Sequence, residues 1–549
     1  MLSNDLWKVL FKRRNVPGFG GRRHAGGEAE EPLRAELLSV AQLKRFAQEL
    51  AGEHAVDTGP GYNRLLPRLA DNAQALRGAH EVILAADAAG RRLSAPEEWL
   101  LDNFYLIEQQ IELARIHLPR RYSHLLPRLT RGPHRGLPRV YGLAAELIAH
   151  LDGLLDAESI TAFVGAYQAA KTLKLGELWA FPISLRLALI ENLRRVAVRV
   201  AGRRRDLDDG LAWANRMLAV AESEPRQLIR LLAQFADDRT VLSAPFLSEL
   251  VGRLQSQGAP VSIVLNWIDQ TLAEESTTVA QRLQQDGHEQ AAEHLSIINS
   301  IGSLRFLGAM DWKVFVEEQS RVEQILRRDP AGAYARQDFA TRDHYRHLVE
   351  QLAMRSGRSE TEVARLALEL ASSAPQTADG ERSRHIGSWL VGGDRFTLRK
   401  KVGCPRTLRY ALGLLFRRYR LFFYLTGVVG ATLLIAAWPP WLCGFSFTDW
   451  RVWMLVAAAF IPASTLALSL VNFAVTANVA PHPLPRLDFS NGIPDAHRTM
   501  VAVPALLTGA HTLDTLLEHL EIHFLGNRDR NLQFALLTDF ADADAETLP

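Results

Sequence analysis

Between residues 31 and 371, apolar side chains recur at the spacing of amphipathic helices. One such stripe, with the i, i+3, i+4 and i+7 spacing of a helix with one buried face, consists of Ile160, Phe163, Val164 and Tyr167. Strand patterns are scarce over the same region, and no repeat of fixed period is visible. We therefore predict a cytoplasmic all-helical region over residues 31–371, without the regular architecture of a solenoid.

Two helix boundaries in this region carry recognisable signals. Ser359 and Glu362 have the spacing of a capping box, which predicts a helix starting just after Ser359. Pro182 precedes a periodic apolar pattern, so we expect it to be the first residue of a helix, where its missing N–H costs nothing. Ser, Gly, Pro and Asp then become frequent, and residues 372–420 are predicted to be a linker followed by a basic juxtamembrane segment.

Two long runs without charge follow, over residues 421–438 and 452–475. Eighteen residues of helix span roughly 27 Å, close to the hydrocarbon thickness of a bilayer, and the second run is longer. Tryptophan and tyrosine flank both runs, as at membrane interfaces. We therefore predict a two-helix transmembrane hairpin joined by a periplasmic loop over residues 439–451. The alternative is a pair of buried core helices in a soluble protein.

The positive charges predict the orientation of this hairpin. Residues 395–420 hold nine Lys or Arg and no acid, whereas the predicted loop holds only Arg451. Positively charged flanks stay on the cytoplasmic side, so both termini are expected there. The two cysteines, Cys404 and Cys443, would then lie on opposite sides of the membrane. The basic segment is expected to bind anionic lipid headgroups of the bilayer.

The remaining composition narrows the classes of function. Residues 1–30 are basic, with a glycine-rich part at residues 17–27, and lack the long apolar run of a signal peptide, so we predict a flexible tail. The alternative for the apolar patch near its start is a helix lying on a membrane surface. A net charge of +2 argues against a nucleic-acid partner. Two cysteines exclude a disulfide framework and a cysteine-rich zinc site, and no metal ligands are assigned.

A basic stretch also lies inside the helical region, over residues 113–145. It holds seven Arg, three His and no acid. One hypothesis is an anion site for lipid headgroups, a nucleotide or nucleic acid. The other, which we favour, is a connector broken by prolines, whose arginines pair with acids elsewhere in the fold. The histidine spacing fits no zinc pattern.

The character of the chain changes after a connector over residues 476–498. Residues 499–507 and 532–538 are short apolar strand candidates, and a periodic helical pattern separates them. This order predicts a β–α–β unit, the opening of an α/β domain over residues 499–549. A unit with so few strands leaves its edges unpaired and is expected to be unstable alone.

Asp539 and Asp542 follow the second predicted strand of this unit. Ligands of parallel sheets bind beyond the carboxyl ends of the strands, so these carboxylates are candidates for contacting a nucleotide or helping to hold a metal. The alternative is an ordinary polar loop. We identify no catalytic residue.

Several long segments of the chain are recognisable as family motifs. Near the end these are SNGIPDAHRTMVAVPALLTG and LEIHFLGNRDRNLQFALLTDFADADAETLP. In the helical region they are LDNFYLIEQQIELARIHLPRRYSHLLPRL, PRVYGLAAELIAH, GELWAFPISLRLALIENLRR and RRDPAGAYARQDFATRDHYRHLVEQLA. In the same order, from about residue 95 to the last residue, they resemble the cyclic β-1,2-glucan synthase family.

The resemblance implies a bacterial inner-membrane glycosyltransferase that builds β-1,2-glucan from UDP-glucose with a divalent metal, at a cytoplasmic site in an α/β nucleotide-sugar fold. By position, Asp539 corresponds to the acid that contacts the uracil in that fold. The chain would be the N-terminal anchoring and scaffold portion, ending just inside the transferase domain. We expect it to be inactive alone, with the remainder of the synthase a possible separate chain. The alternative is a stand-alone membrane-anchored helical scaffold or regulatory protein that binds a partner or anionic lipid.

Overall fold

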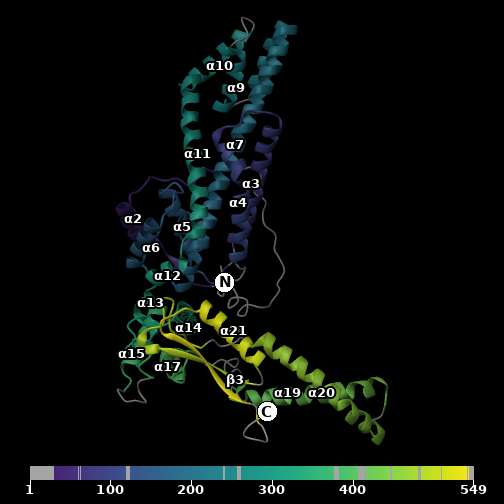
Figure 1. Cartoon of the computed structure of the whole chain (residues 1–549). Coiled ribbons are helices and arrows are strands. Elements are labelled where there is room, and N and C mark those ends of the chain that lie inside the picture. The colour runs from purple at the N-terminus through teal and green to yellow at the C-terminus, as the bar shows by residue number, and fades with distance from the viewer. Residues whose placement is uncertain are drawn as a thin grey trace. The chain divides into compact units, whose positions relative to one another are not determined.

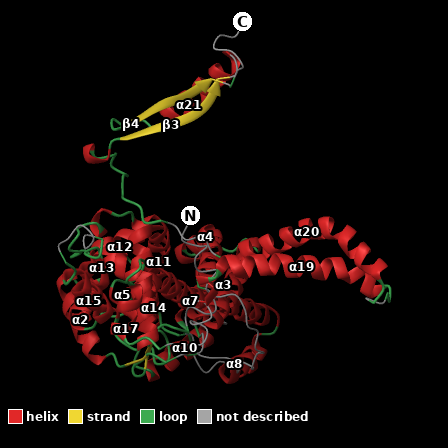
Figure 2. Cartoon of the chain, turned by 90° about the horizontal axis from the view of Figure 1, so that it is seen from below, coloured by secondary structure: helices red, strands yellow, loops and turns green. Residues whose placement is uncertain are grey.

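The computed structural model describes residues 30–59, 61, 64–118, 124–238, 242–255, 261–375, 382–405, 415–416, 418–445, 448–479, 484–507, 510–540 and 542. The chain divides into two compact units, Met1–Arg321 and Val322–Pro549. Helices dominate both units, and the longest strands are the pair near the C-terminus (Figures 1 and 2). The predicted class, mainly α with one β–α–β unit, is confirmed. Apart from Glu30, the predicted basic tail lies outside the described residues.

The described residues of the first unit are mainly helical, with a short strand pair and 3-10 turns between the helices. Its helices in chain order are α2 (Val40–Glu53), α3 (Leu65–Ala88), α4 (Ala95–His117), α5 (Arg139–His150), α6 (Ala157–Ala170), α7 (Leu175–Ser223), α8 (Leu228–Asp238), α9 (Ala244–Leu254), α10 (Ser262–Glu274), α11 (Val279–Ala309) and α12 (Trp312–Gln319). The strands β1 (Val56–Asp57) and β2 (Arg128–Leu129) are antiparallel, and η1 (Pro225–Gln227) precedes α8.

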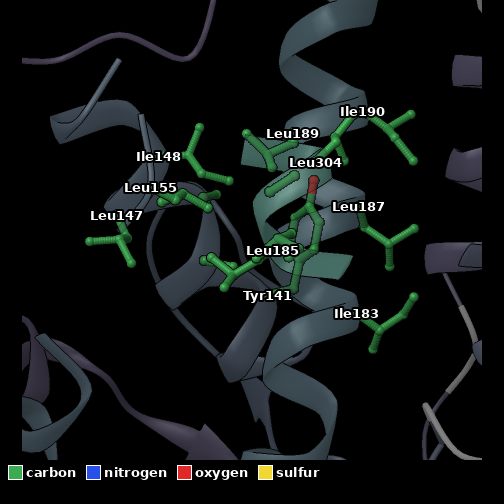
Figure 3. Packing of buried hydrophobic residues seen from close by; sticks show 14 of the residues in the cluster. Tyr141, Leu147, Ile148, Leu155, Ile183, Leu185, Leu187, Leu189, Ile190 and Leu304 are labelled. Carbon is green, nitrogen blue, oxygen red and sulfur yellow. The ribbon is translucent and has the colours of Figure 1, made fainter. Parts of the chain in front are cut away.

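The main hydrophobic core of this unit lies around α5, α6 and the first half of α7. Figure 3 shows side chains of α5, α7 and α11 meeting there, with Tyr141, Leu147, Ile148, Leu155, Ile183, Leu185, Leu187, Leu189, Ile190 and Leu304 labelled. The predicted stripe of α6 is confirmed, since each of its four members is fully buried.

The prediction for Pro182 is wrong. It lies inside the 49-residue helix α7, seven positions after the first residue, Leu175. Proline inside a helix removes one backbone hydrogen bond, at a cost of about 3 kcal/mol in an exposed helix. Here the neighbouring Phe181 and Ile183 are buried, and their packing offsets that cost.

The second half of α7 contributes to a separate core with α8, α9 and α10. Phe235 is central to it, with ring centroids 5.1 Å from Trp213, 5.8 Å from Phe246 and 5.4 Å from Trp267. Gly210 of α7 allows α9 to approach closely, because a Cβ at that position would lie 2.5 Å from the backbone oxygen of Phe246.

The second unit begins with a small helical body. Its elements are α13 (Arg321–Leu326), η3 (Tyr334–Arg336), α14 (Phe339–Ser356), α15 (Glu360–Ser372), α16 (Ile386–Leu390) and α17 (Arg395–Val402). The predicted capping box is confirmed, since the Ser359 hydroxyl accepts a bond from Glu362 N and the Glu362 carboxylate accepts one from Ser359 N. The body has its own core, which includes Leu398 and Val402 of α17.

Two long apolar helices follow, α19 (Arg420–Leu442) and α20 (Trp450–Asn478), and both are long and apolar enough to cross a membrane. They pack against each other through a small buried cluster, and the Tyr424 hydroxyl donates to Asn472 Oδ1 at 2.8 Å. Most of their surface is exposed although it is apolar, as at Leu434 and Ile461, each 73% exposed.

The last elements are η4 (Asp495–His497), β3 (Thr499–Leu507), α21 (Ala510–Gly526) and β4 (Leu532–Phe540). The two strands are parallel and in register from Thr499↔Leu532 to Leu507↔Phe540. Among the described residues they form a two-stranded sheet whose outer edges pair with no other strand. Both strands keep apolar side chains exposed, including Leu506 at 60% and Leu537 at 66%.

Candidate functional site

The carboxyl ends of β3 and β4 hold both acids that the sequence singles out. Asp539 pairs in register with Leu506, inside β4 rather than just after it, because the strand extends to Phe540. Asp542 lies two residues beyond the end of that strand. Both are exposed at the edge of the sheet where ligands of parallel sheets bind.

Asp539 lies on the face of the sheet opposite to α21. Phe534 contacts Phe524 of α21, with ring centroids 6.4 Å apart, which places that helix on the face of Phe534. Side chains alternate along a strand, so the odd-numbered residues of β4, among them Leu537 and Asp539, project to the other face. A ligand approaching that open face would meet the carboxylate without competing with the helix.

The described residues do not assemble a catalytic site around Asp539. Within the described ranges, no group of three or more His, Cys, Asp and Glu converges in a way that could hold a metal ion. A carboxylate at the end of a strand can accept hydrogen bonds from a base or ribose. Glycosyl transfer also needs an acceptor site and a general base at reacting distance, and neither is assembled around Asp539 in the part of the chain that is described.

The opposite end of the β–α–β unit is held by a polar turn that the sequence predictions missed. Between α21 and β4, Asp529 accepts hydrogen bonds from the backbone N–H groups of Asn531 and Ile493, both at 2.8 Å. These two bonds, in that order, lower the pKa of Asp529. Asn531 Nδ2 in turn donates to the carbonyl oxygen of Ile493 at 2.7 Å. Asp and Asn in a loop predict hydrogen bonds from the side chain to nearby backbone groups, but they do not predict that the partner here is the distant Ile493.

A second polar contact ties the connector after α20 to the helical body of the same unit. Asp338 N donates to Arg486 O at 3.0 Å, and Asp488 N donates to Arg336 O at 2.8 Å. Together they form an antiparallel bridge between Gln337 and Leu487. Residues 484–488 therefore return to the helical body that precedes α19 in the chain.

The basic stretch at residues 113–145 includes structural ion pairs. Arg139 is buried and forms a two-pronged pair with Glu177, with oxygens at 2.8 and 2.5 Å. Arg128 reaches Asp57 at 3.2 Å. Burial alone would lower the pKa of Arg139, but Glu177 outweighs it and raises that pKa. These two arginines fit the favoured interpretation, whereas Arg120 and Arg121 lie outside the described residues.

Comparison with known proteins identifies a curated relative of this chain. The cyclic β-(1,2)-glucan synthase NdvB of Rhizobium meliloti (strain 1021) is 32% identical over 535 residues, which cover 94% of this chain. The match covers only 18% of that relative, so the chain spans less than a fifth of its length. No family model matches the chain. The resemblance seen in the sequence is therefore confirmed. By sequence, this chain belongs to the cyclic β-(1,2)-glucan synthase family, and it aligns with a small part of the relative's length.

Proposed function

We propose that this chain forms the membrane-anchoring and scaffold portion of a cyclic β-1,2-glucan synthase. The observation that carries the proposal is 32% sequence identity to such a synthase, in an alignment that covers 94% of this chain. The order of elements supports it, since the apolar hairpin leads directly into a parallel β–α–β unit with a carboxylate at its ligand-binding edge.

In this proposal α19 and α20 cross the inner membrane as a hairpin. Their 23 and 29 residues correspond to roughly 35 and 44 Å of helix, against about 30 Å of hydrocarbon, so both would tilt. Exposed apolar surface on this scale is unfavourable in water and favourable in lipid. The bond between Tyr424 and Asn472 satisfies two polar groups that would otherwise face hydrocarbon.

Contacts within the second unit support placing both ends of the hairpin on one side. The helix before the hairpin, α17, buries Leu398 and Val402 in the core of the body. The connector after the hairpin pairs with the same body through Gln337 and Leu487. The basic residues 395–420 favour the cytoplasm for that side, where they would also contact anionic lipid headgroups.

The β–α–β unit would begin the transferase domain. Asp539 would accept hydrogen bonds from the nucleotide of UDP-glucose, with Asp542 close to the same ligand. The metal and the catalytic base would be held by other residues of the complete synthase. The described residues contain no group of side chains that could hold the metal, and we expect the 549-residue chain to bind and anchor rather than to catalyse.

Thiol labelling tests the membrane arrangement. In intact spheroplasts, a membrane-impermeant maleimide is expected to label Cys443, which is exposed, and to leave Cys404 unlabelled. In inverted vesicles we expect Cys404 to be labelled. Its labelling should be slower than that of Cys443 in spheroplasts, because Cys404 is half-buried. Cys443→Ser and Cys404→Ser variants assign each signal. Labelling of Cys404 from the periplasm would contradict the arrangement.

Transfer of radiolabelled glucose from UDP-glucose tests the enzymatic part. Membranes that contain only this chain are expected to make no β-1,2-glucan. Membranes that also contain a polypeptide with the remaining synthase sequence should make it. Glucan synthesis by the 549-residue chain alone would contradict the assignment. Binding to anionic vesicles without any UDP-glucose binding, with or without the second polypeptide, would instead favour the stand-alone scaffold.

A further inference from the structure

The connector between α20 and β3 is tied down at two separate points. The first tie joins residues 486–488 to the helical body, and the second joins residues 493–495 to the turn between α21 and β4. Between them lie only residues 489–492, all of which are exposed, and the half-buried Ile493 follows. Within this stretch the bonds are local, since Gly492 N donates to Phe489 O and Ser490 N donates to Asp488 Oδ1, both at 3.0 Å, and the Phe489 ring lies 5.7 Å from that of His497. A single turn between two fixed points is the place where a hinge would bend.

The first tie is a short piece of antiparallel pairing. Its bonds join Asp338 N to Arg486 O and Asp488 N to Arg336 O, so they flank the facing residues Gln337 and Leu487. Arg486 N also donates to the Thr341 hydroxyl at 3.1 Å. The backbone N–H groups of Asp338, Arg486 and Asp488 thus all have partners in this tie, although the connector itself is largely exposed.

The loop that receives the connector is itself fixed in place. The Asp329 carboxylate accepts hydrogen bonds from the backbone N–H groups of Ala333 and Tyr334, at 3.1 and 3.0 Å. It also contacts Nδ1 of His385, just before α16, at 2.8 Å, and the backbone N of Ile386, the first residue of α16, at 2.9 Å. A buried carboxylate with four partners holds this loop against α16, so the surface offered to the connector is preformed.

We propose that the body of α13–α17 is a bracket that holds both ends of the α19–α20 hairpin and carries the β3–α21–β4 unit on a hinge at residues 489–492. Five backbone steps separate the two ties, which limits the reach of the hinge to about 18 Å. Gly492 has φ of +101°, a conformation that side-chain-bearing residues rarely adopt, and it forms the end of the hinge. The membrane setting of the bracket rests on the proposed function, whereas the ties themselves do not.

A disulfide tests the first tie in the full-length chain. Facing residues of this non-hydrogen-bonded antiparallel type have Cα atoms about 4.5 Å apart, within the range that a disulfide spans. In a background of Cys404→Ser and Cys443→Ser, Gln337→Cys with Leu487→Cys should oxidise nearly completely under mild oxidant. The matched pair Gln337→Cys with Leu484→Cys should oxidise at least tenfold more slowly. A maleimide mass tag counts the remaining thiols. Equal oxidation of both pairs would overturn the bracket.

Proteolysis gives a second readout that leaves Gln337 intact. Asp488→Pro removes the N–H that donates to Arg336 O, whereas Asp488→Ala keeps it. Trypsin cleavage after Arg486, normalised to cleavage after the exposed Arg382, should be about tenfold faster in the proline variant and unchanged in the alanine variant. Equal protection in both variants would also refute the tie. If the tie fails while Cys443 still labels only from the periplasm, the bracket is wrong and the anchoring role stands.

Discussion

Arg346 offers a quantitative test of how the helical body of the second unit is stabilised. Its side chain is fully buried, and Nη1 contacts Glu323 Oε2 at 2.7 Å. Nη2 contacts Asp343 at 3.1 Å, and the guanidinium stacks 5.1 Å from the centre of the Phe339 ring. Glu323 is equally buried and also accepts a bond from the Tyr334 hydroxyl. The perturbation is Arg346→Met, which keeps most of the apolar volume and removes the charge.

The expected cost follows from the charge left behind. Removing one partner of a buried ion pair costs about 3–5 kcal/mol, because the other charge remains buried without compensation. Arg327 still donates to Glu323 at 2.8 Å and Tyr334 at 2.5 Å, so the lower end applies. A loss of about 3 kcal/mol corresponds to roughly a 100-fold increase in the population of the opened body.

Hydrogen–deuterium exchange of the detergent-solubilised chain measures that opening directly. Peptides from α14 are expected to exchange roughly 100-fold faster in Arg346→Met. Peptides from α6, in the other unit, should keep their rates and serve as an internal control. Arg355→Met is the matched substitution on α14, since Arg355 is exposed, and should change the rates less than threefold.

Two outcomes would refute this reasoning. Acceleration of less than threefold in Arg346→Met would mean that the buried pair adds little beyond what its neighbours supply. Equal acceleration in Arg346→Met and Arg355→Met would mean that replacing either arginine destabilises α14 to the same extent, so that the buried ion pair makes no specific contribution. Arg346→Lys should fall between, because lysine keeps the charge and loses the second prong and the ring stacking.

The other predictions concern the first unit. Gly210→Ala should destabilise the α7–α9 core by about 1–3 kcal/mol, because the new Cβ would meet the Phe246 carbonyl oxygen at 2.5 Å. In Gly202→Ala, on the same helix, the new Cβ meets nothing within 4 Å, and the variant should be stabilised by about 0.5–1 kcal/mol. Hydrogen-exchange rates of α9 peptides distinguish the two variants. Burial raises the pKa of Glu191. The hydrogen bond and charge of Arg68, together with Arg194 and Asn72, outweigh burial and lower that pKa to about 2. A carboxyl group whose pKa is lowered by folding stabilises the folded state at pH values above its unfolded pKa. About 3 kcal/mol of stability should therefore be lost as the pH falls from roughly 5 to 2. Glu191→Gln should remove that part of the pH dependence of hydrogen exchange in α7.

Local patterns in the sequence predicted local structure well. The stripe from Ile160 to Tyr167 became a buried helix face, and Ser359 with Glu362 formed the capping box. Pro182 misled because its local preference for a first turn was overridden by the packing of a much longer helix. The strand carrying Asp539 was found, although its end was placed two residues too early.

The long-range contacts were beyond the reach of pattern analysis. Arg139 and Glu177 are 38 residues apart, and Gln337 and Leu487 are 150 apart. Nothing in the spacing of either pair specifies its partner, since ion pairs and backbone bridges depend on how whole helices are placed. For the same reason, the tie that fixes the connector was not predicted, although one of its segments, residues 336–338, lies in a stretch that resembles the family.

The 49 residues of α7 have a consequence for how the first unit tolerates changes in chain length. The helix runs about 74 Å and contributes side chains to two separate cores, with Gly202 between them. One residue inserted near Gly202 would rotate every later side chain by about 100° and turn Trp213 and Met217 out of the distal core. Insertions or deletions between the two cores should therefore survive only near whole helical turns, whereas loops such as that at η1 are free of this periodic constraint.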